Sequence, residues 1–496
     1  MQVRQDSRLS RTGFVTIYMI FGMMTLLPVV GLAIDFSILY NVKARLQRAA
    51  DAGAIGAGSM VQRSTNIANP ATNAALTNAV QRFFDANLRP TPWRATQTAY
   101  TATVTQDAVT KVRTIQVDAS YSVPMLFLRV VGVGNSTVSV RSIAKIRFVN
   151  MVMVVDRSGS VQRVGSPAII KSSLTQFVAN SSTSIFVDGR DVVGLVSYGG
   201  NYKVDYTPTA SFQTATPDIG TAINNVFFDT NNSTNTGEGL YQGWYQLTQL
   251  NQNGALNVIL LITDGRPSAL TGTFDATSSP YCTDKTPKQG VITSPVQNPF
   301  PPPTNRGTSG VLKVSPPCTS AGCEPNTVVT NSAGCRFSTP SANSGAFSQD
   351  IFTIPAMIGP VTNITGANVP YQTTFPSTTG FYSGGGNATN NAVSLRYAAF
   401  NYADNVAKAI RLDTTYNPVI YAIGLTFNQA TYPNEEPLDA DFLARLANDP
   451  SYRSPTTGLG VYQTGQTAGK YYNVTYNGLA AALQDITGQI LRLATN

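Results

Sequence analysis

The stretch from Met151 to Ser160 constrains the fold of this 496-residue chain more than any other, and it reads Met-Val-Met-Val-Val-Asp-Arg-Ser-Gly-Ser. Its apolar run is typical of a parallel strand with both faces covered by helices. In a doubly wound sheet, ligand sites lie where such strands end. Asp156, Ser158 and Ser160 place three oxygen-bearing side chains there, and Mg²⁺ or Mn²⁺ prefers hard oxygen donors. Because Asp and Ser also cap helices, the stretch alone leaves a metal site and a helix cap open.

Strands and helices alternate from Asn150 onward, which predicts an α/β fold with a doubly wound, mostly parallel sheet. A strand at 255–263 ends at Asp264 and Gly265, and a helix at 236–250 opens with Thr236 and Gly237. The other predicted helices span 166–180, 392–411, 441–447 and 477–493, and the other strands span 191–198, 203–206 and 418–425.

The polar residues at these strand and helix ends resemble, in their order along the chain, the metal-ion-dependent adhesion site (MIDAS) of the von Willebrand factor A family; they are Asp156, Ser158, Ser160, Thr236 and Asp264. The resemblance covers residues 149–268 and about 384–496. The resemblance implies that Ser158, Ser160 and Thr236 bind Mg²⁺ or Mn²⁺ directly, and that Asp156 and Asp264 act largely through water. Hydroxyl ligands would leave the cation able to accept an Asp or Glu carboxylate from a partner protein. A cap at Thr236 and a simple turn after Asp264 are the alternatives.

An uncharged run at 14–34 follows a short segment, 1–13, that we expect to be cytoplasmic. Twenty-one residues at about 1.5 Å each reach about 31 Å, the thickness of a bilayer core. We predict a transmembrane anchor, with a cleavable signal peptide as the alternative. Lys and Arg are nearly balanced on the two sides of the run, so the positive-inside rule does not fix the orientation.

Two motifs accompany the anchor. Gly31 to Asp35 form a Gly-x-x-x-Asp element, and Leu46 to Ala52 read Leu-Gln-Arg-Ala-Ala-Asp-Ala. Together they resemble the start of the TadE/TadG-like proteins of tight-adherence (Flp) pilus systems. The resemblance implies a single-pass protein of the bacterial inner membrane. Gly13 and Phe14 are similar to a prepilin cleavage junction, but Tyr18 stands where glutamate is expected, so cleavage stays open.

Residues 35–148 predict a helix at 67–88 and a small antiparallel sheet, because apolar residues alternate at 115–123 and 138–148. This outline is similar to a pilin, and an ordinary spacer domain is the alternative.

The domain at 149–496 is interrupted at about 269–383 by an insertion rich in Pro, Ser and Thr. It holds all four cysteines, which predict two disulfides whose connectivity the sequence leaves open. Disulfides form in oxidising compartments, so we expect the part of the chain after the anchor to lie in the periplasm. A zinc site is the alternative, although a Cys-x2-Cys pair is absent. Because the insertion leaves the sheet after Asp264, it either frames the metal site or decorates the surface. The cysteines are Cys282, Cys318, Cys323 and Cys335.

The composition excludes several classes of function. The chain contains no histidine, which excludes a Ser-His-Asp triad and His-ligated zinc, and we expect no enzyme. Residues 1–150 carry 16 Lys and Arg against 6 Asp and Glu, but these are scattered, so we expect no nucleic-acid binding. The sequence therefore predicts a noncatalytic protein-binding module of pilus assembly or cell-surface adhesion. A structural pilin-like subunit or scaffold, whose metal only stabilises the fold, is the alternative.

Overall fold

The computed structural model describes residues 11–495 except 65, 91, 109–110, 165–166, 180–185, 229–232, 275–287, 294–360, 363–367, 370–391, 434 and 436. Contacts within the chain divide it into unit 1, which runs to Ile146 apart from 109–111, and unit 2, which spans Arg147–Ala494. The four cysteines, and with them the predicted disulfides, lie outside the described residues.

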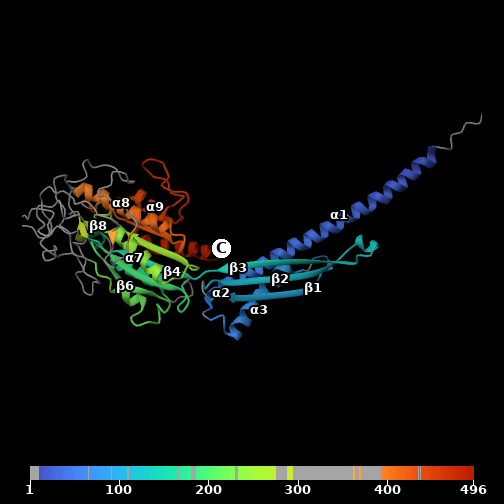
Figure 1. The fold of residues 1–496 in the computed structure, drawn as a ribbon, viewed down its shortest axis with the longest axis horizontal. Coiled ribbons are helices and arrows are strands. Elements are labelled where there is room, and N and C mark those ends of the chain that lie inside the picture. The colour runs from blue at the N-terminus through green and yellow to red at the C-terminus, as the bar shows by residue number, and fades with distance from the viewer. Residues whose placement is uncertain are drawn as a thin grey trace, which may run out of the picture. The chain divides into compact units, whose positions relative to one another are not determined.

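Unit 1 begins with one long helix, α1 (Arg11–Gly56), whose two halves face different surroundings (Figure 1). Side chains from Val15 to Leu27 are exposed, whereas Ile38, Val42 and Leu46 are buried in the core of the unit. Among the described residues, α1 is the one helix long and apolar enough to cross a membrane, with a mean hydropathy of 2.2 over its most apolar window. The first half is therefore consistent with a single-pass membrane anchor.

The second half of α1 packs with α3 on a three-stranded antiparallel sheet of order β1-β2-β3. The predicted helix at 67–88 and both predicted strands are confirmed. Sequence reasoning missed β1, because this edge strand is mostly exposed and lacks apolar alternation. The elements are α2 (Gly58–Arg63), α3 (Pro70–Leu88), η1 (Pro92–Arg94), β1 (Thr96–Gln106), β2 (Arg113–Pro124), η2 (Leu128–Val131) and β3 (Asn135–Ile146).

Unit 2 is built on a six-stranded sheet of order β13-β12-β7-β4-β5-β6, which is parallel except for the edge strand β6. The predicted doubly wound sheet is confirmed. Sequence reasoning missed β13, an edge strand of mixed burial. The strands are β4 (Val149–Asp156), β5 (Val192–Tyr198), β6 (Tyr202–Thr209), β7 (Leu256–Thr263), β12 (Val419–Thr426) and β13 (Lys470–Thr475).

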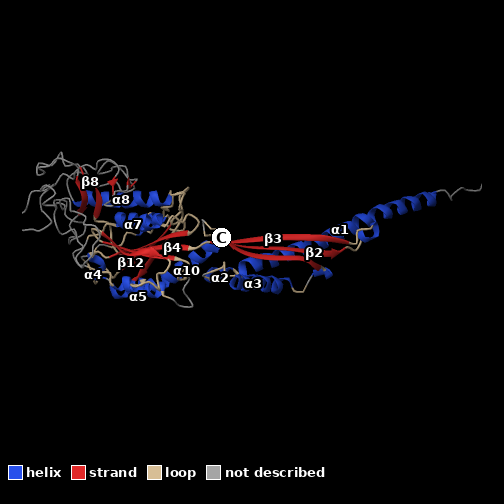
Figure 2. Cartoon of the chain, turned by 60° about the horizontal axis from the view of Figure 1, so that its bottom comes forward, coloured by secondary structure: helices blue, strands red, loops and turns tan. Residues whose placement is uncertain are grey.

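Helices cover both faces of this sheet (Figure 2). Val152 and Val154 of β4 pack under α7, α8 and α9, whereas Met151 and Met153 face α5, α6 and α10, so the all-apolar strand serves two cores. The helices are α4 (Gly159–Val164), α5 (Pro167–Val178), α6 (Ile219–Asn224), α7 (Thr236–Gln249), α8 (Ala392–Arg411), α9 (Ala440–Ala447), η3 (Tyr476–Gly478) and α10 (Leu479–Thr495).

Short strands occur within the range of the predicted insertion, 269–383. β8 (Ala269–Phe274) pairs with β9 (Lys288–Thr293) in an antiparallel ribbon, and β10 (Val361–Thr362) pairs with β11 (Asn368–Val369). Leu270 is buried in the same core as α7 and α8. The first residues after the Asp264 loop therefore belong to the packed domain.

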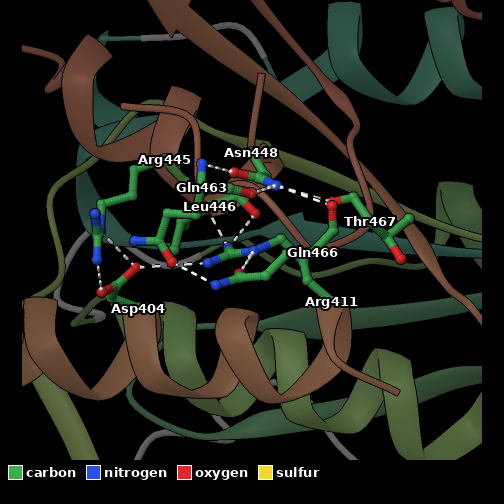
Figure 3. A network of polar contacts seen from close by, with 8 residues as sticks. All are labelled: Asp404, Arg411, Arg445, Leu446, Asn448, Gln463, Gln466 and Thr467. Carbon is green, nitrogen blue, oxygen red and sulfur yellow. Dashed lines mark hydrogen bonds and ion pairs between the residues drawn. The ribbon is translucent and has the colours of Figure 1, made fainter. Parts of the chain in front are cut away.

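A polar network fastens α8 to α9 and to the loop before β13 (Figure 3). Asp404 of α8 accepts two hydrogen bonds of 2.8 Å from the Arg445 guanidinium of α9. Arg411 donates through Nε to Gln466 at 2.8 Å, and through Nη1 to the last carbonyls of α9. Asn448 donates to three carbonyls of the same loop. These bonds satisfy buried charges and fix the helix that follows the insertion.

Candidate metal centre

Asp156 is the last residue of β4 and is buried at the carboxyl edge of the sheet. Its Oδ1 accepts the backbone N–H of Ser158 at 2.7 Å, which tightens the turn after the strand. Its Oδ2 accepts the hydroxyl of Thr263 at 2.5 Å. Val155 of β4 pairs with Ile262 of β7, so the parallel register brings Thr263 beside Asp156. Sequence reasoning missed Thr263, although its place before Asp264 at a strand end was a usable signal.

A chain of hydrogen bonds joins the two serines to Asp264. The hydroxyls of Ser158 and Ser160 lie 3.1 Å apart, and Ser160 Oγ donates to Asp264 Oδ1 at 2.8 Å. The structure thus brings together four of the five predicted residues through direct contacts, across 104 residues of sequence between Ser160 and Asp264.

The other oxygen of Asp264 is held from the far end of the domain. Tyr476, in η3 directly after β13, donates its hydroxyl to Oδ2 at 2.8 Å. Gly265 follows Asp264, and a Cβ there would lie 3.3 Å from Ser160 Oγ and 3.7 Å from Asp156 Oδ2. The turn after Asp264 is therefore part of the site, and a larger residue would crowd its oxygens.

Thr236 is the first residue of α7, but it does not cap that helix. The N-cap is Asn235, whose side chain accepts the N–H of Glu238 and donates to Thr271 Oγ1 at 2.9 Å. Thr236 is fully buried, and within the described residues its Oγ1 has no hydrogen-bond partner. The Tyr198 hydroxyl lies close to the hydroxyls of Thr236 and Thr263 and to Asp156, but within the described residues neither it nor Thr236 Oγ1 makes a hydrogen bond of normal geometry. Thr236 is therefore positioned by the Asn235 cap while its own hydroxyl is left for another ligand.

Burial is the main cause of the shifted pKa values of the two carboxyl groups at this site. It raises the pKa of Asp156, against the hydrogen bonds from Thr263 and Ser158 and the nearby positive charge of Arg157. Burial and the neighbouring Asp156 carboxylate likewise raise the pKa of Asp264. Two buried carboxylates close together repel each other when both are charged, and a cation between them would remove that cost.

The residues at this edge fit a hard divalent cation. Hydroxyl and carboxylate oxygens converge there, and the unpartnered Thr236 oxygen supplies a further donor. Across the described ranges no group of three or more Asp, Glu, Cys or His side chains is placed to hold a metal ion. A cation bound here would therefore depend on Ser and Thr oxygens, which carry no charge.

Two arginines tie the loop after β12 to the rim of this site. Arg163 of α4 forms a bidentate ion pair with Glu435, with Nε 2.5 Å from Oε1 and Nη2 2.9 Å from Oε2. Arg266, two residues after Asp264, donates to the Pro437 carbonyl at 3.1 Å. These contacts hold the α4 turn and the Asp264 turn against one common loop.

Two family models match separate parts of the chain. Residues 150–279, which include all five predicted site residues, match the von Willebrand factor type A domain. Residues 13–60 match the Flp pilus-assembly TadE/G-like family. The chain thus combines a TadE/G-like segment, which lies within unit 1, with a von Willebrand factor A domain in unit 2. Both resemblances drawn from the sequence are confirmed.

Several solved structures are similar to this chain. The PilB minor pilin from Streptococcus sanguinis is 14% identical, with 81% of this chain and 80% of that chain covered and a TM-score of 0.35. The vWF domain of the type V pili tip protein Mfa5 from Porphyromonas gingivalis is 17% identical, with 71% and 97% covered and a TM-score of 0.33. The pilus adhesin SpaC from Lactobacillus rhamnosus GG is 13% identical, with 79% and 34% covered and a TM-score of 0.32. Among curated proteins, no sequence matches this chain.

Proposed function

We propose that this protein is a membrane-anchored, noncatalytic binding module of a tight-adherence pilus system, which captures the Asp or Glu carboxylate of a protein partner. The partner would be another pilus-assembly component or a cell-surface ligand. The TadE/G-like segment and the apolar half of α1 support the setting. The von Willebrand factor A domain supports the binding role.

The buried Thr236 oxygen carries the metal part of this proposal. A buried hydroxyl without a partner costs free energy. The Tyr198 hydroxyl close to Thr236 is also near the buried carboxyl groups of Asp156 and Asp264, and the Asp156 carboxylate raises the pKa of Asp264. Ser158, Ser160 and Thr236 would hold Mg²⁺ or Mn²⁺ directly, and Asp156 and Asp264 would hold it largely through water. When bound, the cation supplies an electrophilic position for a partner's carboxylate.

The chain's own residues prepare this site. Thr263 and the Ser158 N–H orient Asp156, Tyr476 orients Asp264, and Asn235 fixes the start of α7. Each of these partners is packed in the domain, so little rearrangement is needed when a cation binds.

Calorimetric titration of the full chain in detergent with Mg²⁺ tests the site. We expect a millimolar or tighter dissociation constant, and no binding by the Asp156→Ala, Ser158→Ala double variant. Ser172→Ala, on the exposed side of α5, is the matched control and should bind like the wild type. Identical titrations for the wild type and the double variant contradict the metal site.

We further propose that the chain crosses the inner membrane once, with unit 2 and the part of unit 1 that follows the anchor in the periplasm. A reporter enzyme that is active only outside the cytoplasm, fused after Asn496, should be active. A cytoplasmic result reverses the orientation.

A structural role is the second candidate function, because the α1 helix packed on the β1-β2-β3 sheet is similar in outline to a pilin. In that case the metal would stabilise unit 2 without contacting a partner. Co-purification of bound proteins with and without a chelator separates the two functions. Partners lost on chelation from a protein that stays folded favour capture through the metal.

A further inference from the structure

The turn between β2 and β3, residues 125–134, carries an apolar surface that the fold of unit 1 leaves uncovered. We name these residues the hairpin tip. Leu126, Phe127, Val130 and Val133 are exposed by 57%, 44%, 87% and 44%. Exposed apolar side chains clustered on one loop mark a contact surface rather than ordinary solvent-facing structure.

The hairpin tip is fastened to α1 by a carboxylate. Asp35 is fully buried and accepts three backbone N–H groups from the tip: Leu126 at 3.0 Å, Phe127 at 3.0 Å and Leu128 at 2.7 Å. Burial alone would raise the pKa of Asp35, but these three donors lower it, so the carboxylate stays charged. The tip therefore has a fixed position along the helix.

That position is the end of the apolar run. One turn before Asp35, Gly31 lies against the Phe127 ring, and a Cβ at Gly31 would come within 2.6 Å of Phe127 Cγ. Gly31 stands three residues before the run ends at Ile34, or about 4.5 Å along the helix axis. Figure 1 shows the loop between β2 and β3 beside α1. The tip thus reaches the level at which the anchor meets the headgroups.

The backbone of the tip suits a poorly hydrated surrounding, where unpaired N–H groups are costly. Besides the three N–H groups held by Asp35, Met125 donates to Gly134 and Val133 donates to Leu128. Arg129 is exposed in the same loop as these apolar side chains, where its guanidinium could bind an anionic lipid headgroup. Phe36 and Tyr40 of α1 are exposed just beyond the apolar run, where aromatic residues favour the interface.

We propose that the hairpin tip inserts into the lipid–water interface beside α1, so that unit 1 contacts the membrane at two points. The inference rests on the anchor assigned in the proposed function. The Gly31 and Asp35 element is then a docking place for the tip: glycine admits the Phe127 ring, and the aspartate binds the tip's N–H groups. Docked in this way, unit 1 has a set tilt and rotation on the bilayer.

Photocrosslinking of the full chain tests this in vesicles of phosphatidylethanolamine and phosphatidylglycerol. A benzophenone amino acid replaces Val130 in the tip, Met24 in the anchor, or Ile143 on β3; all three side chains are exposed. Ile143 pairs with Gln116, eight residues before the end of β2 and so about 26 Å from the tip. After illumination, the mass gained by each variant is measured.

The inference predicts a gain of one phospholipid mass at positions 24 and 130 and none at 143. A lipid adduct at 24 but not at 130 overturns the tip insertion and leaves the anchor intact. A covalent dimer at 130 also overturns it and assigns the tip to a second copy of the chain. No lipid adduct at 24 overturns the anchor itself, and the inference with it.

Discussion

The hydroxyl of Tyr476 lies 2.8 Å from Asp264 Oδ2, so a residue 212 positions later in the chain orients the last carboxylate of the candidate metal centre. Tyr476→Phe removes this donor and keeps the ring. Because such supporting bonds hold a carboxylate in the geometry that a metal needs, we expect Mg²⁺ affinity to fall by roughly 10-fold to 100-fold in calorimetry.

Tyr472→Phe is the matched control for this change. Tyr472 donates to Asp485 at 2.7 Å on an exposed surface of the same domain, so its loss should leave the Mg²⁺ titration unchanged. Equal affinities for Tyr476→Phe and the wild type would show that Asp264 needs no support from Tyr476.

Thr236→Val tests the unpartnered hydroxyl. The substitution removes only a contact with the Tyr198 hydroxyl that falls short of normal hydrogen-bond geometry, so stability in a chelator should change little. At Mg²⁺ concentrations about 100 times the dissociation constant, the wild type should gain about 2.7 kcal/mol of stability, and the variant should gain nothing. Thermal unfolding with and without Mg²⁺ measures both effects.

Thr175 in α5 offers a matched control, since its Oγ1 is likewise buried without a partner in the described chain. Thr175→Val should keep the full response to Mg²⁺. If Thr236→Val also keeps it, Thr236 is not a ligand.

Asp35 links stability to pH. The pKa of Asp35 is lowered in the folded protein, so its contribution is complete above the unfolded-state pKa of about 3.9 and is lost as the pH falls through the folded-state value. Asp35→Asn should therefore unfold at lower temperature than the wild type at pH 7, and this difference should shrink below about pH 4. Unfolding in detergent across this pH range measures it. Asp51→Asn, also on α1, is the control: Asp51 accepts one side-chain hydrogen bond, from Gln47, which an asparagine oxygen can still accept, so we expect a smaller loss of stability at pH 7.

Gly31→Leu should displace the hairpin tip, because the new side chain meets the Phe127 ring. We expect a loss of about 1–3 kcal/mol in stability and faster hydrogen exchange across residues 125–134. Gly22→Leu is the control, since nothing lies within 4 Å of a Cβ there. Adding Phe127→Ala to Gly31→Leu should restore part of the stability; a further loss would contradict the clash.

The elements that could be predicted from sequence are those buried on a regular face. The runs ending at Asp156 and Asp264 are apolar throughout because helices cover both sides of the sheet, and the bounds of α8 agree with the prediction at 392–411. The strands β1 and β13 could not be predicted, because each buries a single residue, Val104 in β1 and Tyr471 in β13, and so carries no repeated apolar pattern.

The candidate metal centre likewise has a part that could be predicted from the sequence and a part that could not. Its five residues follow a fixed order that the sequence displays, but their supporting partners depend on tertiary pairing. Thr263 reaches Asp156 only because β7 lies beside β4, and Tyr476 follows a strand that was not predicted. The Gly31 and Asp35 motif was visible, whereas its partner, the backbone of the hairpin tip, has no side-chain signature that a sequence could show.

The continuity of α1 has a mechanical consequence. The helix has 46 residues, about 69 Å, and the same rod enters the apolar run and forms the core of unit 1. Tension applied along the anchor would load the contacts of α1 with α3, β2 and β3 together, in shear, instead of peeling them apart one at a time. A protein built in this way resists extraction from the membrane under tension, because all contacts between the helix and the rest of unit 1 must break together.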